Sequence, residues 1–357
     1  MTVDREQWIG FRWQRHGLDG QSSDRSLDDL FALGVQGGRQ AGAELSLMQR
    51  ASKIGGALAV EAIGPDGPLV NLWSVRGAPH AHRITHVDFI RDALAPDASD
   101  EGGTRYVAAV DEVAGALRSV VKGRMSKADA SRAVADQVSK SLVSWCERCK
   151  ATHVPDGTFR AAGLQAQVVL GPEERRATTL CPKPRHRQHK VSDARLELVR
   201  TYLRVNGPST KTLLREWLGG AEATVATWSR LDDLVKVQVA NKRYELPEEL
   251  LDAVRKAPKA SGVVLVPAND PYLRQVDRSL LVPDSRQRQQ IWKALSGPGA
   301  LLVDGEVAGF WRYRGSEHKL NITTFTDLKP AQRSKAEKNA ALVAEANRDD
   351  QPKVVWD

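Results

Sequence analysis

Apolar residues follow helical spacing through much of this chain, and short stretches of alternation mark candidate strands. Near the N-terminus, Ser26 can cap a helix that Gly34 interrupts, and a second helix follows and ends at Gly55. Two short strands are predicted next, over 58–63 and 69–75, with a turn of Gly, Pro and Asp between them. Helices followed by a short hairpin are the outline of a winged helix.

The same outline recurs twice along the chain. Between residues 107 and 170 the pattern predicts three helices, the third over 138–149, and then a loose strand pair over 159–170. The next copy has helices followed by strands over 235–239 and 244–246, with Ala240, Asn241, Lys242 and Arg243 at the tip between them. A basic tip between two strands is typical of a wing that contacts DNA.

From residue 263 the pattern changes to strands. Candidates lie over 263–266, 300–303 and 307–311, and Asp304-Gly305 predicts a hairpin between the last two. A charged helix over 329–348 precedes a short tail. The fold class predicted is α+β, with three tandem winged-helix modules, a small β domain and a C-terminal helix. The expected boundaries are 1–95, 96–182, a linker over 183–190, 191–258, 259–328 and 329–357.

Composition narrows the class of partner. The 357 residues carry 52 Lys and Arg against 44 Asp and Glu, a formal charge of +8 that places polyanions first among partners. No apolar run reaches the roughly 18 residues of a membrane span, and the N-terminus has no signal-peptide pattern. We therefore expect a cytoplasmic protein without membrane contact. Three cysteines cannot form a disulfide scaffold and fit a reducing compartment.

The predicted linker over 183–190 is basic and contains no acid. Its cations are Lys183, Arg185, Arg187 and Lys190. Two interpretations stay open for it: a solvated linker, or a strap that contacts DNA phosphates.

Several sequence runs carry a resemblance to a known family. They lie at 73–80, 206–208, 217–219, 265–273, 277–278, 281–284, 302–305 and 309–312. In this order they resemble AlkZ/YcaQ-type DNA glycosylases over nearly the whole chain. The resemblance implies tandem winged helices and a β-barrel-like domain around a concave face that binds double-stranded DNA. It also implies hydrolytic removal of N-alkylated purines, including bulky adducts and crosslinked bases, without a metal or nucleotide cofactor.

The family uses two glutamines one residue apart to hold a water below the anomeric carbon. A purine alkylated at N7 is already cationic and leaves without a general acid, so neutral amides suffice. Matching the family pattern without gaps places Gln36 on the first glutamine and Gly38 on the second. Half of the pair is missing. Gln40 and Arg39, a candidate DNA contact, are near enough in sequence to substitute, but the guanidinium of Arg39 would be unfavourable next to a developing cation. Gln36 alternatively caps the preceding helix.

A literal glutamine pair occurs elsewhere. Gln165 and Gln167 lie in the second module, on a predicted strand where they would share one face. By its position we interpret this pair as a coincidence.

The run from Arg76 to Arg83 is the other candidate for the site. His80 falls on the histidine that follows an Arg-Gly pair in the family, and a pKa near neutrality would let it contact a phosphate or polarise water. A histidine hydrogen-bonded inside the module is the alternative. Arg76, His82 and Arg83 are predicted to contact the DNA backbone.

Two further sets have structural as well as functional interpretations. Cys146, Cys149, His153 and Cys181 can be written as a zinc set, but Cys146 and Cys149 fall inside a predicted helix, where small buried residues are common. We therefore predict no metal site. The run from Asp270 to Arg278 is predicted to fix a loop of the β domain, and Trp311 to lie in the core.

Two functions remain open. The first is a DNA glycosylase that acts on alkylated purines with Gln36 and His80. The second is a DNA-binding protein, either a damage sensor or a transcription regulator, that has lost catalysis with the second glutamine. Both predict a monomer associated with the nucleoid.

Overall fold

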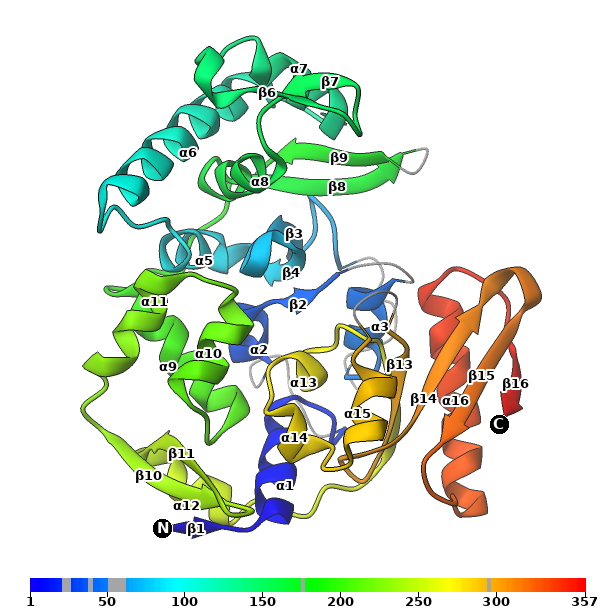
Figure 1. Ribbon diagram of the computed structural model, residues 1–357. Helices are drawn as coiled ribbons and strands as arrows, with labels where there is room; N and C mark the ends of the chain where they lie inside the picture. The colour runs from blue at the N-terminus through cyan, green and yellow to red at the C-terminus, as the bar shows by residue number, and fades with distance from the viewer. Residues whose placement is uncertain (21–26, 38–40, 51–61, 175–176, 294–296) are drawn as a thin grey trace.

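The computed structural model describes residues 1–20, 27–37, 41–50, 62–174, 177–293 and 297–357. Figure 1 shows α6 and α7 at the top, α9–α11 on the left, and the last strands with α16 on the right. Ser26 and most of the strand predicted over 58–63 lie outside the described residues. No helix in the described part of the chain is both long and apolar enough to cross a membrane.

The first part of the chain is helical and then forms a hairpin. Its helices are α1 (Arg5–Arg15), α2 (Asp28–Leu33), α3 (Gly42–Met48) and α5 (Val87–Ala93), with η1 (Val75–Gly77) and η2 (Ile84–His86). Its strands are β1 (Thr2–Val3), β2 (Val35–Gln36), β3 (Leu69–Trp73) and β4 (Pro79–Arg83). The sequence pattern did not predict α1, whose Trp8, Phe11 and Trp13 are buried.

The second part corrects two sequence predictions. Its helices are α6 (Glu101–Val120), α7 (Lys127–Ala135) and α8 (Asp156–Gln165), with η3 (Lys140–Leu142); its strands are β5 (Met125–Ser126), β6 (Ser144–Cys146), β7 (Ala151–His153), β8 (Val168–Glu174) and β9 (Ala177–Pro182). The helix expected over 138–149 is wrong, because β6 turns back antiparallel onto β7. The strand pair expected over 159–170 is wrong in its first half. Residues 159–165 belong to helix α8 and contribute its buried residues.

Strands of these two parts form one sheet. The six-stranded sheet has the order β2-β4-β3-β8-β9-β5, so the hairpins expected to serve separate modules lie side by side. The seam between them is a single antiparallel residue pair, Asn71 with Leu170.

The third part matches its prediction closely. It contains α9 (Ala194–Asn206), α10 (Lys211–Leu218), α11 (Glu222–Ala226), η4 (Thr227–Arg230), β10 (Leu234–Val239), β11 (Lys242–Pro247), η5 (Glu248–Leu250) and α12 (Leu251–Arg255). The turn between the strands is made by Ala240 and Asn241 in the left-handed region, with φ of 47° and 65°. N-terminal strand β1 completes this sheet by pairing in parallel with β10.

The last part forms a five-stranded sheet in the order β12-β13-β14-β15-β16. Its strands are β12 (Val263–Val266), β13 (Gly299–Val303), β14 (Glu306–Arg314), β15 (Lys319–Thr324) and β16 (Lys353–Trp356); its helices are α13 (Pro271–Arg274), α14 (Arg278–Leu281), α15 (Ser285–Ile291) and α16 (Pro330–Ala346), with η6 (Gly315–Glu317). Asp304 and Gly305 form the predicted turn, with φ of 51° and 82°.

The core crosses the expected boundaries. One apolar cluster contains residues of α2, α9 and the C-terminal sheet, and a second joins α1 to β10, β11 and β12. A third fills the space among α6, α7 and α8. The parts of the chain are therefore packed as one body, a mixed α and β architecture in which the sheets and helices bring distant segments together.

Candidate functional site

Gln36 ends a short strand whose flanks are held by close backbone packing. A Cβ on Gly34, where φ is 88°, would come within 2.5 Å of the His82 ring, so a side chain is excluded there. After Gln36, the Gly37 N–H donates to the Pro79 carbonyl at 2.9 Å. Strand β2 pairs antiparallel with β4 so that Gln36 lies directly opposite His80. Side chains of such a pair lie on the same face of the sheet.

Arg76 fixes the orientation of the Gln36 amide. Its Nη2 donates to Gln36 Oε1 at 2.9 Å, and its Nη1 donates to the Trp217 carbonyl at 2.5 Å. Arg76 itself has a left-handed backbone, with φ of 58°, which is uncommon for a residue other than glycine. Gly219 makes room for it, because a Cβ there would lie 2.3 Å from Arg76 Cγ. Three segments far apart in sequence thus meet at one guanidinium.

His80 is buried and neutral. Burial, together with the charges of Arg76 and Arg274, lowers its pKa to about 3, although the hydrogen bond to the Ala78 carbonyl opposes this shift. Its Nδ1 lies 2.9 Å from the Ala78 carbonyl, so Nδ1 carries the proton and Nε2 keeps a lone pair. His80 therefore cannot act as a cationic phosphate contact, but it can accept a hydrogen bond from water.

His82 does not reach the surface, contrary to the predicted backbone contact. It is fully enclosed, with Nε2 2.9 Å from Ser74 Oγ and Nδ1 3.0 Å from the Phe31 carbonyl. Burial lowers its pKa to about 3. The side chain holds α2 against β4, a structural role that the sequence left open for His80 and not for His82.

Two arginines that sequence reasoning missed complete the site. Burial, and then the charges of Arg274 and Arg278, lower the pKa of Arg76 to about 10, so the three guanidinium groups lie near one another. Arg278 stacks over the Trp292 ring at 5.3 Å. The sequence shows two arginines four residues apart here, but the pattern of that run favours a packing role. We call Gln36, Arg76, His80, Arg274 and Arg278 the Gln36 site.

A hollow adjoins the Gln36 site. It has a volume of about 1030 Å³ and is lined by Arg274, Arg278 and Trp292, among others. Gly42, also on its wall, lies against the Gln36 carbonyl, since a Cβ there would be 3.7 Å from that oxygen. On the other side, Arg76 lines a second hollow of about 720 Å³. The Gln36 site therefore stands between two open spaces, with cations on its walls.

The other residues predicted to contact DNA fall into two groups: some are paired with acidic side chains, and others are exposed. Arg83 pairs with Asp28 at 2.7 Å, Lys183 with Asp88 at 3.3 Å and Lys242 with Asp277 at 3.0 Å. By contrast Arg185, Arg187, Lys190 and Arg243 are exposed. Gly38, Arg39 and Gln40 lie outside the described residues.

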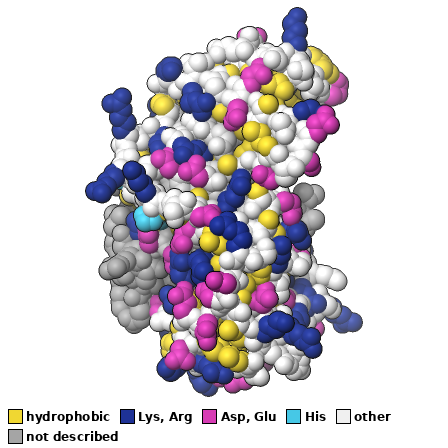
Figure 2. Space-filling model, turned by 90° about the vertical axis from the view of Figure 1, so that its left-hand side faces the viewer, with side chains coloured by type: hydrophobic (Ala, Val, Ile, Leu, Met, Phe, Trp, Pro, Cys, Tyr) yellow, Lys and Arg dark blue, Asp and Glu magenta, His cyan; other side chains and the backbone are white. Residues whose placement is uncertain are grey.

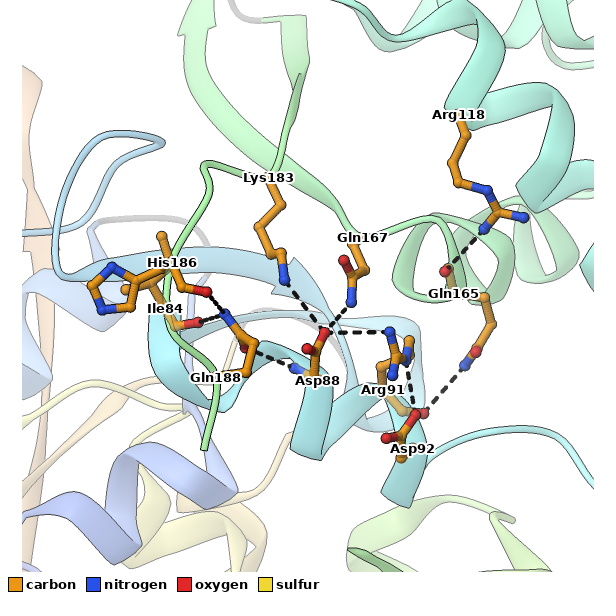
Figure 3. A network of polar contacts seen from close by, with 10 residues as sticks. All are labelled: Ile84, Asp88, Arg91, Asp92, Arg118, Gln165, Gln167, Lys183, His186 and Gln188. Atoms are coloured by element: carbon orange, nitrogen blue, oxygen red, sulfur yellow. Dashed lines mark hydrogen bonds and ion pairs between the residues drawn. The ribbon is translucent and has the colours of Figure 1, made fainter. Parts of the chain in front are cut away.

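The segment 183–190 is attached to the fold, as Figure 3 shows, and Asp88 of α5 is the centre of this attachment. Lys183 and the Gln167 amide both donate to Asp88 Oδ1, while Gln188 Nε2 donates to the Ile84 carbonyl at 3.1 Å. The segment lies along η2 and α5 and presents its remaining cations outward.

Gln165 and Gln167 do not share the face of a strand, so that prediction is wrong. Gln165 is the last residue of α8 and donates to the Arg91 carbonyl at 3.2 Å, and Gln167 has a φ of 57°. Both amides serve the network of Figure 3. This supports the interpretation that the literal glutamine pair is a coincidence.

The run from Asp270 to Arg278 is structural at its start, as predicted. Asp270 forms an ion pair with Arg50 at 2.8 Å, both side chains are inaccessible, and Asp270 also accepts from Ser46 Oγ. Trp311 is buried and donates to the Val266 carbonyl at 3.1 Å. Cys146 and Cys149 are not in a helix, and the only metal-ligand grouping found among the described residues joins them with His153 but not with Cys181.

The excess of basic residues does not make every face of the protein basic. In Figure 2, Lys and Arg side chains are interspersed with Asp and Glu on the face that carries the left-hand side of Figure 1. That face has no uniform basic patch.

Comparison with known proteins identifies the family. A family model described as DNA glycosylase AlkZ-like matches residues 32–348. The chain belongs to the AlkZ-like DNA glycosylases. Among solved structures, this AlkZ-like protein is similar to the Streptomyces sahachiroi DNA glycosylase AlkZ, with a TM-score of 0.75, 18% identity and full coverage of both chains. A comparison with curated proteins finds no match. Membership makes this AlkZ-like protein a DNA repair enzyme whose substrate is DNA.

Proposed function

We propose that this AlkZ-like glycosylase hydrolyses the N-glycosidic bond of N-alkylated, cationic purines in duplex DNA. One observation carries the proposal: the Gln36 amide, held by Arg76, lies opposite the neutral His80 beside a hollow lined with arginines. This is the combination that the chemistry needs, because an uncharged acceptor can hold water while cations hold the DNA backbone.

In the proposed reaction, a water oxygen bonds to C1′ as the C1′–N9 bond breaks. The electron pair of that bond goes to the purine, which loses its positive charge, and the proton released by the water goes to solvent. An alkylated purine needs no general acid, so the enzyme has only to place the water and tolerate an oxocarbenium-like transition state. Gln36 Oε1 has two lone pairs and can accept from Arg76 and from the water together.

His80 is proposed to take the place of the absent second amide. It lies opposite Gln36 across the β2–β4 pair, and its Nε2 can accept a hydrogen bond from the same water. Because its pKa is about 3, it stays uncharged at neutral pH and does not repel the developing cation.

The arginines and the hollows are proposed to hold the nucleotide that reacts. An enzyme that attacks C1′ must draw the damaged nucleotide out of the stack, and Arg274 and Arg278 are placed to bind its phosphates. The hollow of about 1030 Å³ is at the upper end of the range for small-molecule pockets, so a bulky adduct also fits. Bulky or crosslinked purines are therefore part of the proposal.

The rest of the duplex is proposed to follow the outward-facing cations. Arg243 beside the β10–β11 turn, and Arg185, Arg187 and Lys190 of the segment 183–190, are exposed for phosphate contact. In this proposal the tandem winged-helix and β-barrel-like modules act as a monomer in the nucleoid, with neither a metal nor a nucleotide cofactor in catalysis.

The test is base release from a duplex that contains one 7-methylguanine, read as strand cleavage after alkaline treatment. Wild type should produce abasic sites, and Gln36→Ala should lower the single-turnover rate by about 10²–10³, as for removal of one group that stabilises a transition state. Gln137→Ala is the matched control, because that exposed amide accepts from Ser119 Oγ and lines neither hollow. It should retain the wild-type rate.

Two outcomes would overturn the proposal. One is tight binding of the duplex by wild type without release of base, which would support the damage-sensor alternative. Equal rates for Gln36→Ala and wild type would remove Gln36 from catalysis.

A further inference from the structure

The hairpin of β6 and β7 carries a group of side chains that the Gln36 site does not use. Cys146 ends β6, His153 ends β7, and Cys149 lies in the turn between them. One ligand atom from each of these three residues lies within 4.8 Å of the other two. A tetrahedral zinc site with ordinary bond lengths has ligand atoms about 3.5–3.8 Å apart. A contraction of roughly 1 Å at most would therefore complete such a site.

The histidine is oriented as a metal ligand requires. Its Nδ1 lies 2.7 Å from the Val154 carbonyl, which places the proton on Nδ1 and the lone pair on Nε2. Nε2 is shielded from solvent and makes no hydrogen bond. A shielded nitrogen with an unused lone pair beside two thiols is an observation independent of the cysteine spacing.

The two sulfurs lie at the turn end of the hairpin, with ligand atoms of Cys146, Cys149 and His153 all within 4.8 Å of one another. Both cysteines are free thiols, so the sulfurs are available as ligands.

We propose that Cys146, Cys149 and His153 bind one zinc ion, with solvent in the fourth position. Cys181, the fourth residue of the set written from the sequence, is buried on β9 and does not belong to this grouping. Asp156 is not available either, since Lys127 and Arg160 both pair with it.

The hairpin has reason to need a metal. Its strands have three residues each, most of their side chains are exposed, and Trp145 is 60% accessible. A two-stranded hairpin with so little buried surface is marginally stable in water. Zinc would tie the end of β6 to the end of β7, and so hold the loop that leads from α7 to α8. This role is independent of the proposed function, which places the chemistry at the Gln36 site.

The test is Co²⁺ binding to the full-length protein after removal of metal with a chelator, under a reductant that does not bind metals. Wild type should take up one Co²⁺ per chain, with the thiolate charge-transfer and visible bands of a tetrahedral site, and Zn²⁺ should abolish these bands. Cys149→Ser should weaken Co²⁺ binding about 100-fold or more. Cys181→Ser is the matched control and should bind as wild type does.

Absence of the tetrahedral spectrum from wild type would overturn the proposal. So would equal Co²⁺ affinity for Cys149→Ser and wild type. Circular dichroism of each metal-free variant checks that it is folded, and base release from 7-methylguanine DNA tests the glycosylase proposal separately.

Discussion

At the scale of single residues, the burial of neutral histidines is the most consequential feature, because it makes stability depend on pH. His80 and His82 both have a pKa lowered to about 3 by burial, whereas an unfolded histidine titrates near 6.5. Between these values the unfolded chain binds protons that the folded chain does not. The contribution of the two histidines to the unfolding free energy is therefore fully lost only at low pH: it is fully present above about pH 6.5 and decreases as the pH falls.

This predicts acid sensitivity before most carboxylates titrate. Between pH 7.5 and pH 5.0 each of the two histidines should cost about 2 kcal/mol of unfolding free energy. Urea unfolding at both pH values measures the loss. His82→Gln removes one titrating group and should shrink the difference by about 2 kcal/mol, whatever its stability at pH 7.5. An unchanged difference would contradict the assignment.

Arg76 is predicted to act through Gln36 rather than by its charge alone. Arg76→Lys keeps the cation but loses the fork that reaches Gln36 Oε1 and the Trp217 carbonyl at once. Since a hydrogen bond to a charged group is worth about 1.5–3 kcal/mol, we expect kcat to fall about 10- to 100-fold.

Single-turnover and steady-state kinetics on the 7-methylguanine duplex separate kcat from KM in this variant. Arg200→Lys is a suitable control, because the Arg200 guanidinium makes a comparable two-pronged contact, with Asp233, and lines neither hollow. A change in KM alone would contradict the positioning role.

The sequence identified some of this site and missed the rest for physical reasons. Gln36, Arg76 and His80 were found because the family pattern marks them. Their protonation and mutual contacts depend on burial and on Trp217 from another helix, which no local pattern encodes. Arg274 and Arg278 were missed because they follow a buried aspartate, so their run was assigned to packing.

At the scale of elements, the Arg50–Asp270 pair connects the residues that follow α3 to the start of α13, with both charges inaccessible. Asp270 also accepts from Ser46 Oγ and from the Tyr272 N–H. Removing one partner of a buried pair leaves the other charge without compensation.

Asp270→Asn should therefore lower the unfolding free energy by about 3–5 kcal/mol. Glu306→Gln, which breaks the half-exposed pair with Arg5, should cost about 1 kcal/mol or less. Urea unfolding of both variants measures these losses of unfolding free energy, provided that the m-values are unchanged. A smaller loss for Asp270→Asn than for Glu306→Gln would refute the ranking.

Elements with local turn signals were predictable. Asp304-Gly305 and Asn241 adopt the left-handed backbone that their residue types allow, and strand β12 has the predicted bounds. The helix expected over 138–149 failed because its apolar residues do not bury one face; Trp145 is exposed and the Cys-x-x-Cys turn reverses the chain. The periodicity of apolar residues does not reveal a stretch whose structure depends on a turn and on contacts with distant segments.

At the scale of the whole molecule, the effect of the +8 charge on DNA binding depends on where the basic residues lie. Several surface cations are neutralised by acids, whereas Arg274 and Arg278 face the hollow beside Gln36. Affinity for undamaged duplex should therefore depend on these two residues and not on the catalytic amide.

Each phosphate contact changes the slope of log affinity against log salt by about 1. The double variant Arg274→Ala/Arg278→Ala should thus flatten the slope by about 2, measured by fluorescence anisotropy at several salt concentrations. Gln36→Ala should leave the slope unchanged. Arg105→Ala, which removes an exposed cation already paired with Glu101, should do the same; an equal effect of Arg105→Ala would refute the assignment.

The seam of the six-stranded sheet limits how this chain can be divided. Strands β2, β4 and β3 come from before residue 95 and strands β8, β9 and β5 from after it, and they meet at Asn71 and Leu170. A fragment cut near residue 95 would leave β3 as an open edge, a template for pairing with other copies. Separate expression of the two halves should give self-associating material, whereas co-expression should allow them to reassemble across the seam.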